Sequence, residues 1–317
     1  MIRHRRLLFV ASAFTAAGCA SSNDDGTSTR SPSHRRSGFE SPERAVDAFA
    51  ASVVDPTRAE ECLGPGGFQT LACCDDGDLA SDDAELERVR ALVDECVAIA
   101  DAGPDACVIF IGNEEWELPA PLVRTGAEGT GGWRFDLDAG REEMLCRTIG
   151  WNELRAIATL RELGAAQVEF RELTDDAAYA MKWKSEPGRR DGLYWESAEG
   201  VPTSPLGPLF CTDAVADCED RDPACSVPCH GYSFRILTRQ GAHAEGGEKD
   251  YLDSEGRMTR GFAFVAWPVE YRKDGVMTFL SSDDGGVYEK DFGSATAEEA
   301  AALVAFDPDP SWTIVTD

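Results

Sequence analysis

The chain has 317 residues, a length that accommodates two modest domains. Its 58 acidic and 30 basic residues give a formal net charge of −28, which excludes nucleic acid and disfavours anionic lipid surfaces as partners. We interpret the scattered acidic residues as a solvated surface rather than as a cation-binding device.

The first 18 residues have the three parts of an export signal: a basic start, an apolar run over residues 7–14 and small residues at positions 16–18. Cys19 follows directly. The order Ala-Ala-Gly-Cys resembles the lipobox of bacterial lipoproteins, although that pattern usually has Leu where Ala16 stands. The resemblance implies that Cys19 is acylated and becomes the first residue of the mature chain. Ordinary secretion with an unmodified Cys19 is the alternative.

Residues 19–38 are rich in Ser, Thr, Asp and Arg and have little to bury, so they predict a flexible tether. A lipid anchor followed by a tether predicts a protein of the cell envelope. In a Gram-negative host the lipoprotein resemblance implies the periplasmic face of the outer membrane, because Ala20 and Ser21 rather than Asp follow the cysteine.

Residues 39–140 predict an N-terminal α+β domain. Ser41 and Pro42 mark the start of a first helix, a second short helix carries Cys62, and an amphipathic pattern predicts a helix over 82–100. Three β-rich segments follow, at 106–111, 121–124 and 133–137. Helices followed by a curved antiparallel sheet give an α+β architecture.

Residues 141–317 predict a C-terminal domain in which a long helix over 141–172 packs on an antiparallel sheet. The expected strands are 232–238, 262–267, 276–280 and 287–290, with a tight turn at 283–286. Thr296 and Glu299 have the spacing of a capping box for a last helix. The apolar side of the long helix is formed by Met144, Leu145, Ile149, Ile157, Leu160, Leu163 and Val168.

Ten cysteines remain when Cys19 is set aside, and an even number in an exported chain predicts disulfide bonds. Four of them lie in a cysteine-rich insertion at 211–229, where a zinc cluster with His230 is the alternative. Zinc sites normally contain tight Cys-x₂-Cys pairs, which this insertion lacks, so we favour disulfides and assign no metal ligand. The ten are Cys62, Cys73, Cys74, Cys96, Cys107, Cys146, Cys211, Cys218, Cys225 and Cys229.

A family resemblance covers roughly residues 39–315. It is carried by the segments PLVRTGAEGTGGWRFDLDAGREEMLCRTIGWNEL, DGLYW, SPLGPL, HGYSFRIL, MTRGFAFVAWPVEYRKDGVMTF and VYEKDFG. Together these resemble the bacterial domain-of-unknown-function 2950 family of uncharacterised exported proteins. The resemblance implies export and the architecture described above, and it implies no particular activity.

A weaker resemblance concerns the C-terminal domain alone. The helix around residues 152–161 and the order of the later strands are similar to the globular parts of type IV pilins and pseudopilins. The pilin membrane helix with its processing site has no counterpart here. The resemblance therefore implies a pilin-like fold rather than filament formation.

Residues for catalysis are few. Besides His34 in the tether, the expected mature chain offers only His230 and His243, and motifs of the common serine, zinc and phosphate chemistries are missing from the sequence. We assign no catalytic or cofactor-binding residue. The seven tryptophans either pack in the core or line a binding cleft.

These observations favour an exported, lipid-anchored cell-envelope protein that acts as a non-enzymatic interaction or assembly component. Its expected partners are the membrane, through the lipid anchor, and other envelope proteins, but not nucleic acid. The alternative is a periplasmic enzyme or small-ligand-binding protein with a site at the domain interface or near His230.

Overall fold

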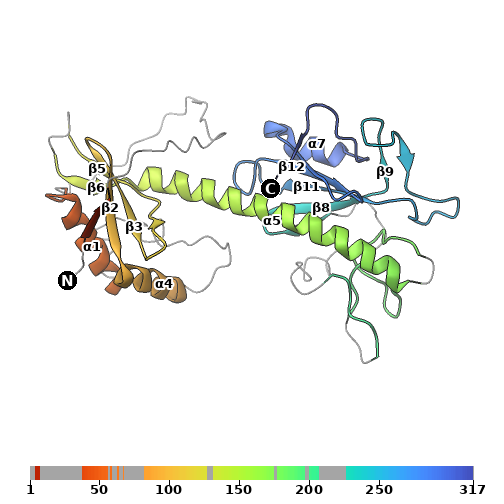
Figure 1. Cartoon of the computed structure of the whole chain (residues 1–317), viewed down its shortest axis with the longest axis horizontal. Coiled ribbons are helices and arrows are strands. Elements are labelled where there is room, and N and C mark those ends of the chain that lie inside the picture. The colour runs from red at the N-terminus through yellow and green to blue at the C-terminus, as the bar shows by residue number, and fades with distance from the viewer. Residues whose placement is uncertain are drawn as a thin grey trace. The chain divides into compact units, whose positions relative to one another are not determined.

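The computed structural model describes residues 38–55, 58, 63, 67, 82–126, 131–174, 177–196, 200–206 and 226–316, and the backbone of residues 4–7 (Figure 1). Within these residues the protein is an α+β structure with antiparallel sheets and a long helix, which confirms the predicted fold class. Contacts divide the chain into an N-terminal unit, residues 1–147, and a C-terminal unit, residues 148–317. The boundary falls inside the long helix.

The N-terminal unit contains a sheet with the order β1-β2-β3-β5-β6, in which β4 pairs with β3. The pairs are antiparallel except that β1 runs parallel to β2. β1 lies within the segment predicted as an export signal. The strands are β1 (His4–Leu7), β2 (Val97–Gly103), β3 (Ala106–Ile111), β4 (Trp116–Glu117), β5 (Leu122–Arg124) and β6 (Trp133–Phe135).

Two helices accompany this sheet, α1 (Pro42–Val54) and α4 (Asp82–Glu95). α1 begins as predicted: the Ser41 hydroxyl accepts a hydrogen bond from the Arg44 N–H at 3.4 Å, and Pro42 occupies the first turn. Phe49 of α1 and Ile109 of β3 are fully buried in the same core. Alternate residues of β3 point into that core, as expected for a strand with one covered face.

The predicted helix over 82–100 is wrong at its C-terminal end. α4 stops at Glu95, and Val97 begins strand β2, whose first four residues are all buried. Those residues pair with β3 on one edge and β1 on the other, so the run Val-Ala-Ile-Ala is a central strand. A short apolar run of this kind has no period that distinguishes a strand from a buried helical turn.

The C-terminal unit contains an antiparallel sheet with the order β14-β13-β12-β11-β8-β7. The four strands predicted for this region are confirmed with small differences in their ends. A separate two-stranded ribbon pairs β9 (Arg239–Gln240) with β10 (Lys249–Asp250). The sheet strands are β7 (Val227–Cys229), β8 (Tyr232–Leu237), β11 (Ala263–Pro268), β12 (Thr278–Ser282), β13 (Val287–Lys290) and β14 (Thr313–Ile314).

Helices α5 (Leu137–Leu173) and α7 (Thr296–Ala302) lie on opposite faces of this sheet (Figure 1). On the α7 face, the buried guanidinium of Arg235 donates hydrogen bonds to the carbonyl oxygens of Ala300 at 2.9 Å, Ala301 at 3.2 Å and Leu303. A cation at the C-terminal end of a helix stabilises its unpaired carbonyl groups. Arg235 therefore ties α7 to β8.

The predicted capping box at Thr296 is wrong. A short 3₁₀ turn, η3 (Gly293–Ala295), leads directly into α7, so Thr296 is already helical. Its hydroxyl donates backwards to the Gly293 carbonyl at 2.7 Å instead of accepting from the helix. The sequence pattern is present, but the preceding turn changes the position of the helix start.

The buried side of α5 agrees with the prediction only in part. Leu160 and Leu163 are fully buried, whereas Leu145 is 41% exposed and Val168 is 50% exposed. At Val168 the inward position is taken instead by its neighbour Gln167, which has no exposed surface. Successive helical residues point about 100° apart, so both cannot face the core.

Leu160→Ala tests the packing of α5. We expect it to lower the free energy of unfolding by roughly 2–5 kcal/mol, because it removes buried methyl groups and leaves a cavity. Leu154→Ala is the matched control on the same helix, since Leu154 is 59% exposed. Urea unfolding followed by circular dichroism compares the two, and equal small losses would contradict the assigned face.

Candidate ligand-binding pocket

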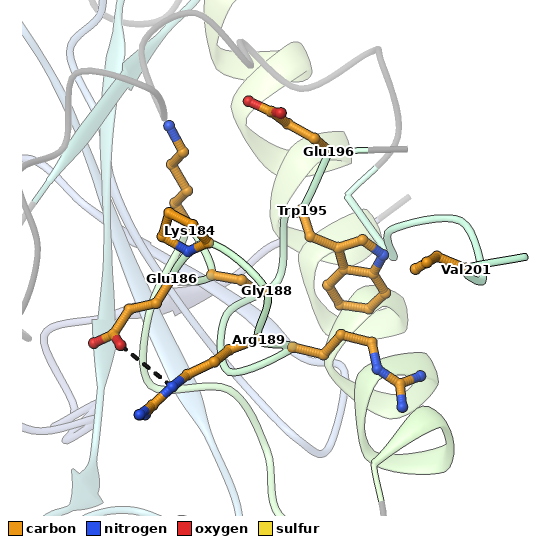
Figure 2. Close-up of a pocket in the computed structure, with 10 residues that line it drawn as sticks. Lys184, Glu186, Gly188, Arg189, Trp195, Glu196 and Val201 are labelled. Carbon is orange, nitrogen blue, oxygen red and sulfur yellow. Dashed lines mark ion pairs between the residues drawn. The ribbon is translucent and has the colours of Figure 1, made fainter. Parts of the chain in front are cut away.

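A pocket of about 470 Å³ in the C-terminal unit is lined by residues 184–190, 195, 196 and 201 (Figure 2). Its volume is within the range of small-ligand sites, about 300–1,000 Å³. Charged side chains and an aromatic wall share its lining. The residues that define it chemically are Lys184, Glu186, Arg189, Arg190, Trp195 and Val201.

A tight turn forms one end of the pocket. The Arg189 N–H donates to the Glu186 carbonyl at 2.9 Å, and Gly188 has a φ of +78°. This is a type II turn, with Pro187 supplying the fixed φ of its second position and glycine the positive φ of its third. The local sequence Glu-Pro-Gly-Arg therefore determines the conformation of this end.

Ser185 and Gly192 join the two arms of the loop over residues 182–195, which pair in parallel where Lys184 meets Tyr194. The Ser185 hydroxyl donates to the Gly192 carbonyl and accepts from the Gly192 N–H, both at 3.0 Å. A Cβ at position 192 would lie 2.5 Å from the carbonyl carbon of Lys184, so only glycine permits this approach. The backbone under the pocket is therefore held by a buried polar pair in addition to the core contacts of Trp183 and Leu193.

An ion-pair cluster lies beside the turn. Lys182 Nζ is 2.9 Å from Asp191 Oδ2 and 3.3 Å from Glu186 Oε1, and Asp191 Oδ1 accepts the Glu186 N–H at 2.9 Å. Burial pushes the pKa of Asp191 upward, but the hydrogen bonds from Lys182 and Glu186 outweigh it and lower that pKa. The bond to Asp191 raises the pKa of Lys182. Both groups are therefore charged at neutral pH.

The pocket is a basic site in an acidic protein. Among its described lining residues, the cations Lys184, Arg189 and Arg190 outnumber the carboxylates Glu186 and Glu196. Arg189 Nε lies 3.4 Å from Glu186 Oε2, the ion pair drawn in Figure 2. No carboxylate of the described residues forms an ion pair with Lys184 or Arg190. The excess positive charge of the pocket lining therefore lies on these two side chains.

Trp195 supplies the apolar wall. Its indole N–H donates to the Pro202 carbonyl at 2.8 Å, and its ring contacts Phe170 of α5 with centroids 6.4 Å apart. The side chain is only 6% exposed, and Figure 2 shows it beside Val201. Because both the edge and the body of the indole are held, its position is set before any ligand binds.

Gln167 connects the segment that carries the pocket to α5. Its side-chain amide donates to the Ala180 carbonyl at 2.9 Å and accepts the Ala180 N–H at 2.7 Å. All these groups are buried. The Gln167 amide therefore supplies the hydrogen bonds that a neighbouring strand would otherwise give to the N–H and the carbonyl of Ala180. The loop that carries the pocket therefore begins at a fixed point on the helix.

The histidines considered in the sequence lie elsewhere. His230 is exposed at the tip of the β7–β8 hairpin, where its φ of 48° and the φ of 76° at Gly231 describe a type I′ turn. His243 is exposed as well, with Nδ1 3.1 Å from Asp307 Oδ1. The described lining of the pocket contains neither residue.

The expectation that all ten cysteines form disulfides is wrong for Cys96, Cys107 and Cys146, which are thiols. Cys107 shows why: on the adjacent strand its direct partner is Asp101, and its sulfur lies 3.7 Å from that carboxylate. Cys229 is in a disulfide bond. No metal-binding group of three or more His, Cys, Asp and Glu side chains occurs within the described part of the chain. Cys19, Cys62, Cys73, Cys74, Cys211, Cys218 and Cys225 lie outside the described residues.

A family sequence model described as "Protein of unknown function (DUF2950)" matches residues 36–315. The chain belongs to the DUF2950 family. This confirms the family membership predicted from the sequence motifs, and the pocket lies inside the matched region. No curated protein and no solved structure matches the chain. The description of DUF2950 names no activity, so the chemistry of the site has to guide the functional interpretation.

The sequence predictions include Trp195 only as one of seven tryptophans that pack in the core or line a cleft, and they miss Arg189 and Arg190. A usable signal was present. Residues 182–190 contain four basic residues in a chain whose net charge is −28. A basic run that surrounds a Pro-Gly turn in an acidic protein is typical of an exposed anion-binding loop.

Gln167→Leu tests the attachment of this loop to α5. It leaves the buried N–H and carbonyl of Ala180 without partners, and we expect a loss of roughly 2–4 kcal/mol in the free energy of unfolding. Glu169→Leu, an exposed position on the same helix, is the control and should change stability little. If urea denaturation gives the same midpoint for both variants, the two hydrogen bonds do not hold this segment.

The ion-pair cluster predicts that this loop is sensitive to acid. Because the pKa of Asp191 in the folded protein lies below its ordinary value of 3.8, the unfolded segment takes up the proton first as the pH falls. The stabilisation that ionised Asp191 gives to the folded protein is therefore complete above its ordinary pKa. It is lost as the pH falls through the lower pKa that Asp191 has in the folded protein. Hydrogen exchange at the Glu186 N–H should show this loss, and Asp191→Asn should remove its pH dependence. Unchanged pH dependence in the variant would exclude Asp191 as the cause.

Proposed function

We propose that this DUF2950 protein is exported, is anchored by a lipid on Cys19, and acts in the cell envelope as a non-enzymatic interaction or assembly component. The observation that carries the proposal is the order of a basic segment, an apolar run and Ala-Ala-Gly-Cys, followed by a polar tether over 19–38. Among the described residues, no helix is long and apolar enough to cross a membrane. The lipid is the anchor that we propose.

Export has a structural consequence for the N-terminal unit. Cleavage before Cys19 would remove β1, which pairs with β2 through residues His4 to Leu7. Strand β2 would then become an edge of the sheet, with Val97–Gly103 available for a new partner strand. In a Gram-negative host we place the mature protein on the periplasmic face of the outer membrane, with other envelope proteins as partners.

The pocket favours a second candidate, a small-ligand-binding protein. Its ammonium and guanidinium groups bind anions without having to gain or lose a proton, and the carboxylates of Glu186 and Asp191 are held in ion pairs. This chemistry suits recognition better than proton transfer. We therefore place the binding site at the pocket lined by residues 184–190, 195, 196 and 201 rather than near His230, and propose binding in preference to catalysis.

The proposal also covers the domain organisation and the fold of the C-terminal unit. We interpret the two units as separate domains, and the helix and sheet of the C-terminal unit as pilin-like. The support is a long helix lying on a sheet whose strands follow one another in antiparallel order. Because the resemblance concerns fold, it carries no expectation of filament formation.

Cys19→Ser tests the anchor. The wild-type protein should partition into the detergent phase of a cloud-point extraction, and its N-terminal peptide should carry a mass consistent with an acylated Cys19. The variant should either enter the aqueous phase or retain residues 1–18 as an uncleaved precursor. Cys96→Ser is the matched control, since it changes a thiol outside the lipobox. A soluble wild-type protein whose N-terminus lies elsewhere would overturn the anchoring proposal.

A further inference from the structure

We infer that the solvent side of helix α5 binds the same side of α5 in a second copy of this chain, with the two helices antiparallel. The contact is made by a row of exposed residues at alternating spacings of three and four, which we call the α5 stripe: Trp151, Leu154, Ala158, Arg161, Ala165 and Val168. The inference goes beyond the proposed envelope role, because it assigns a second copy of the chain as a partner.

Large apolar side chains of the α5 stripe are open to solvent. Leu154 is 59% exposed, Val168 is 50% exposed and Trp151 is 42% exposed, whereas Leu160 and Leu163 on the sheet side are fully buried. The spacing of the stripe is that of the a and d positions of a coiled coil, which pack against a facing helix. The helix therefore has two apolar sides, and the sheet covers one of them (Figure 1).

The charges along the α5 stripe balance, unlike those of the whole chain. Two copies that each carry a net charge of −28 repel one another, so they approach best where the local charges cancel. Between Trp151 and Glu169, the charged residues of the stripe and of the row beside it are two arginines and two glutamates: Arg155, Arg161, Glu162 and Glu169. Their charges sum to zero, which makes this side of α5 suited to a second copy.

The order of these charges selects antiparallel helices. When a two-fold axis passes between positions 161 and 162, Arg161 of one copy faces Glu162 of the other, and the symmetry forms this pair twice. A guanidinium has five N–H donors, so Arg161 can bind this carboxylate in addition to a partner in its own chain. The same register places Arg155 beside Glu169 of the second copy. Parallel helices would instead bring the two copies of Arg161 together, and like charges repel.

The same register gives the apolar side chains a place to pack. It sets Leu154 of one copy against Ala165 and Val168 of the other, as a knob of a coiled coil enters a hole. These two residues line a groove of about 210 Å³ beside α5, to which Phe262 also contributes. At the centre Ala158 faces Ala165, and small side chains there allow the helix axes to come close.

Light scattering coupled to size-exclusion chromatography of the detergent-purified full-length chain tests the inference. The measured quantity is the protein mass in each particle over a series of concentrations. Detergent micelles are kept in excess, so that chains without affinity for each other occupy separate micelles. We expect the wild-type protein to form particles of two chains that dissociate to one chain on dilution.

Charge reversals identify the contact. Arg161→Glu and Glu162→Arg should each weaken association by about tenfold or more, because each creates two like-charge contacts across the two-fold axis. The double variant should restore association, because it reverses the pair instead of removing it. Ala158→Glu should abolish association by placing a long charged side chain at the centre. Glu298→Arg is the matched control, since it makes the same charge change at an exposed position of α7 and should leave association unchanged.

Particles of one wild-type chain at concentrations up to about 100 µM would overturn the inference. So would single variants that associate like the wild type, or a double variant that stays monomeric, because either result would place the contact elsewhere. Circular dichroism of each variant checks that it is folded, which we expect because the changed side chains are exposed. The lipid anchor is tested by detergent partition, so either proposal can fail without the other.

Discussion

The C-terminal unit depends on the burial of one side of helix α5. Leu160 and Leu163 lose all contact with solvent there, and they share one continuous core with the aromatic residues of β8 and β11. A side chain of this size contributes about 1.5–3 kcal/mol when it is fully buried. Gln167 lies on the same side of the helix, and its amide is paired on both ends with the peptide of Ala180. The apolar contacts hold the helix to the sheet, and the amide fixes where the next segment starts.

The properties of the pocket follow from that starting point. Beyond Ala180 the chain forms a loop whose arms are joined through Ser185 and Gly192 and whose tight turn is formed by Pro187 and Gly188. Trp195 returns to the helix by packing on Phe170. The result is a rigid loop that presents basic side chains at the surface of a protein with a net charge of −28. A local reversal of charge on a rigid frame concentrates anionic ligands at that place.

The wrong predictions share a cause, since each one required information from outside its own segment. The predicted helix over 82–100 includes Val97 because a buried apolar run looks the same in a strand and in a helix, and only the pairing with β3 distinguishes them. Thr296 has the pattern of a cap, but the preceding turn makes it helical. Cys107 was counted toward disulfides by parity, whereas its cross-strand neighbour is Asp101. Local patterns specify which elements form and leave their ends and partners open.

The sequence by itself determined the α+β class, the long helix, the main strands of the C-terminal sheet, the Pro-Gly turn and the membership of the DUF2950 family. These features depend on residue periodicity, on the backbone restrictions of proline and glycine, and on motifs that are read along the chain. Tertiary structure alone decided that Gln167 is buried in place of Val168, and that Lys184, Arg190 and Trp195 line one pocket. Those outcomes depend on which surfaces meet when a helix, a sheet and a loop pack together, and the spacing of residues in one segment contains no information about the shape of another.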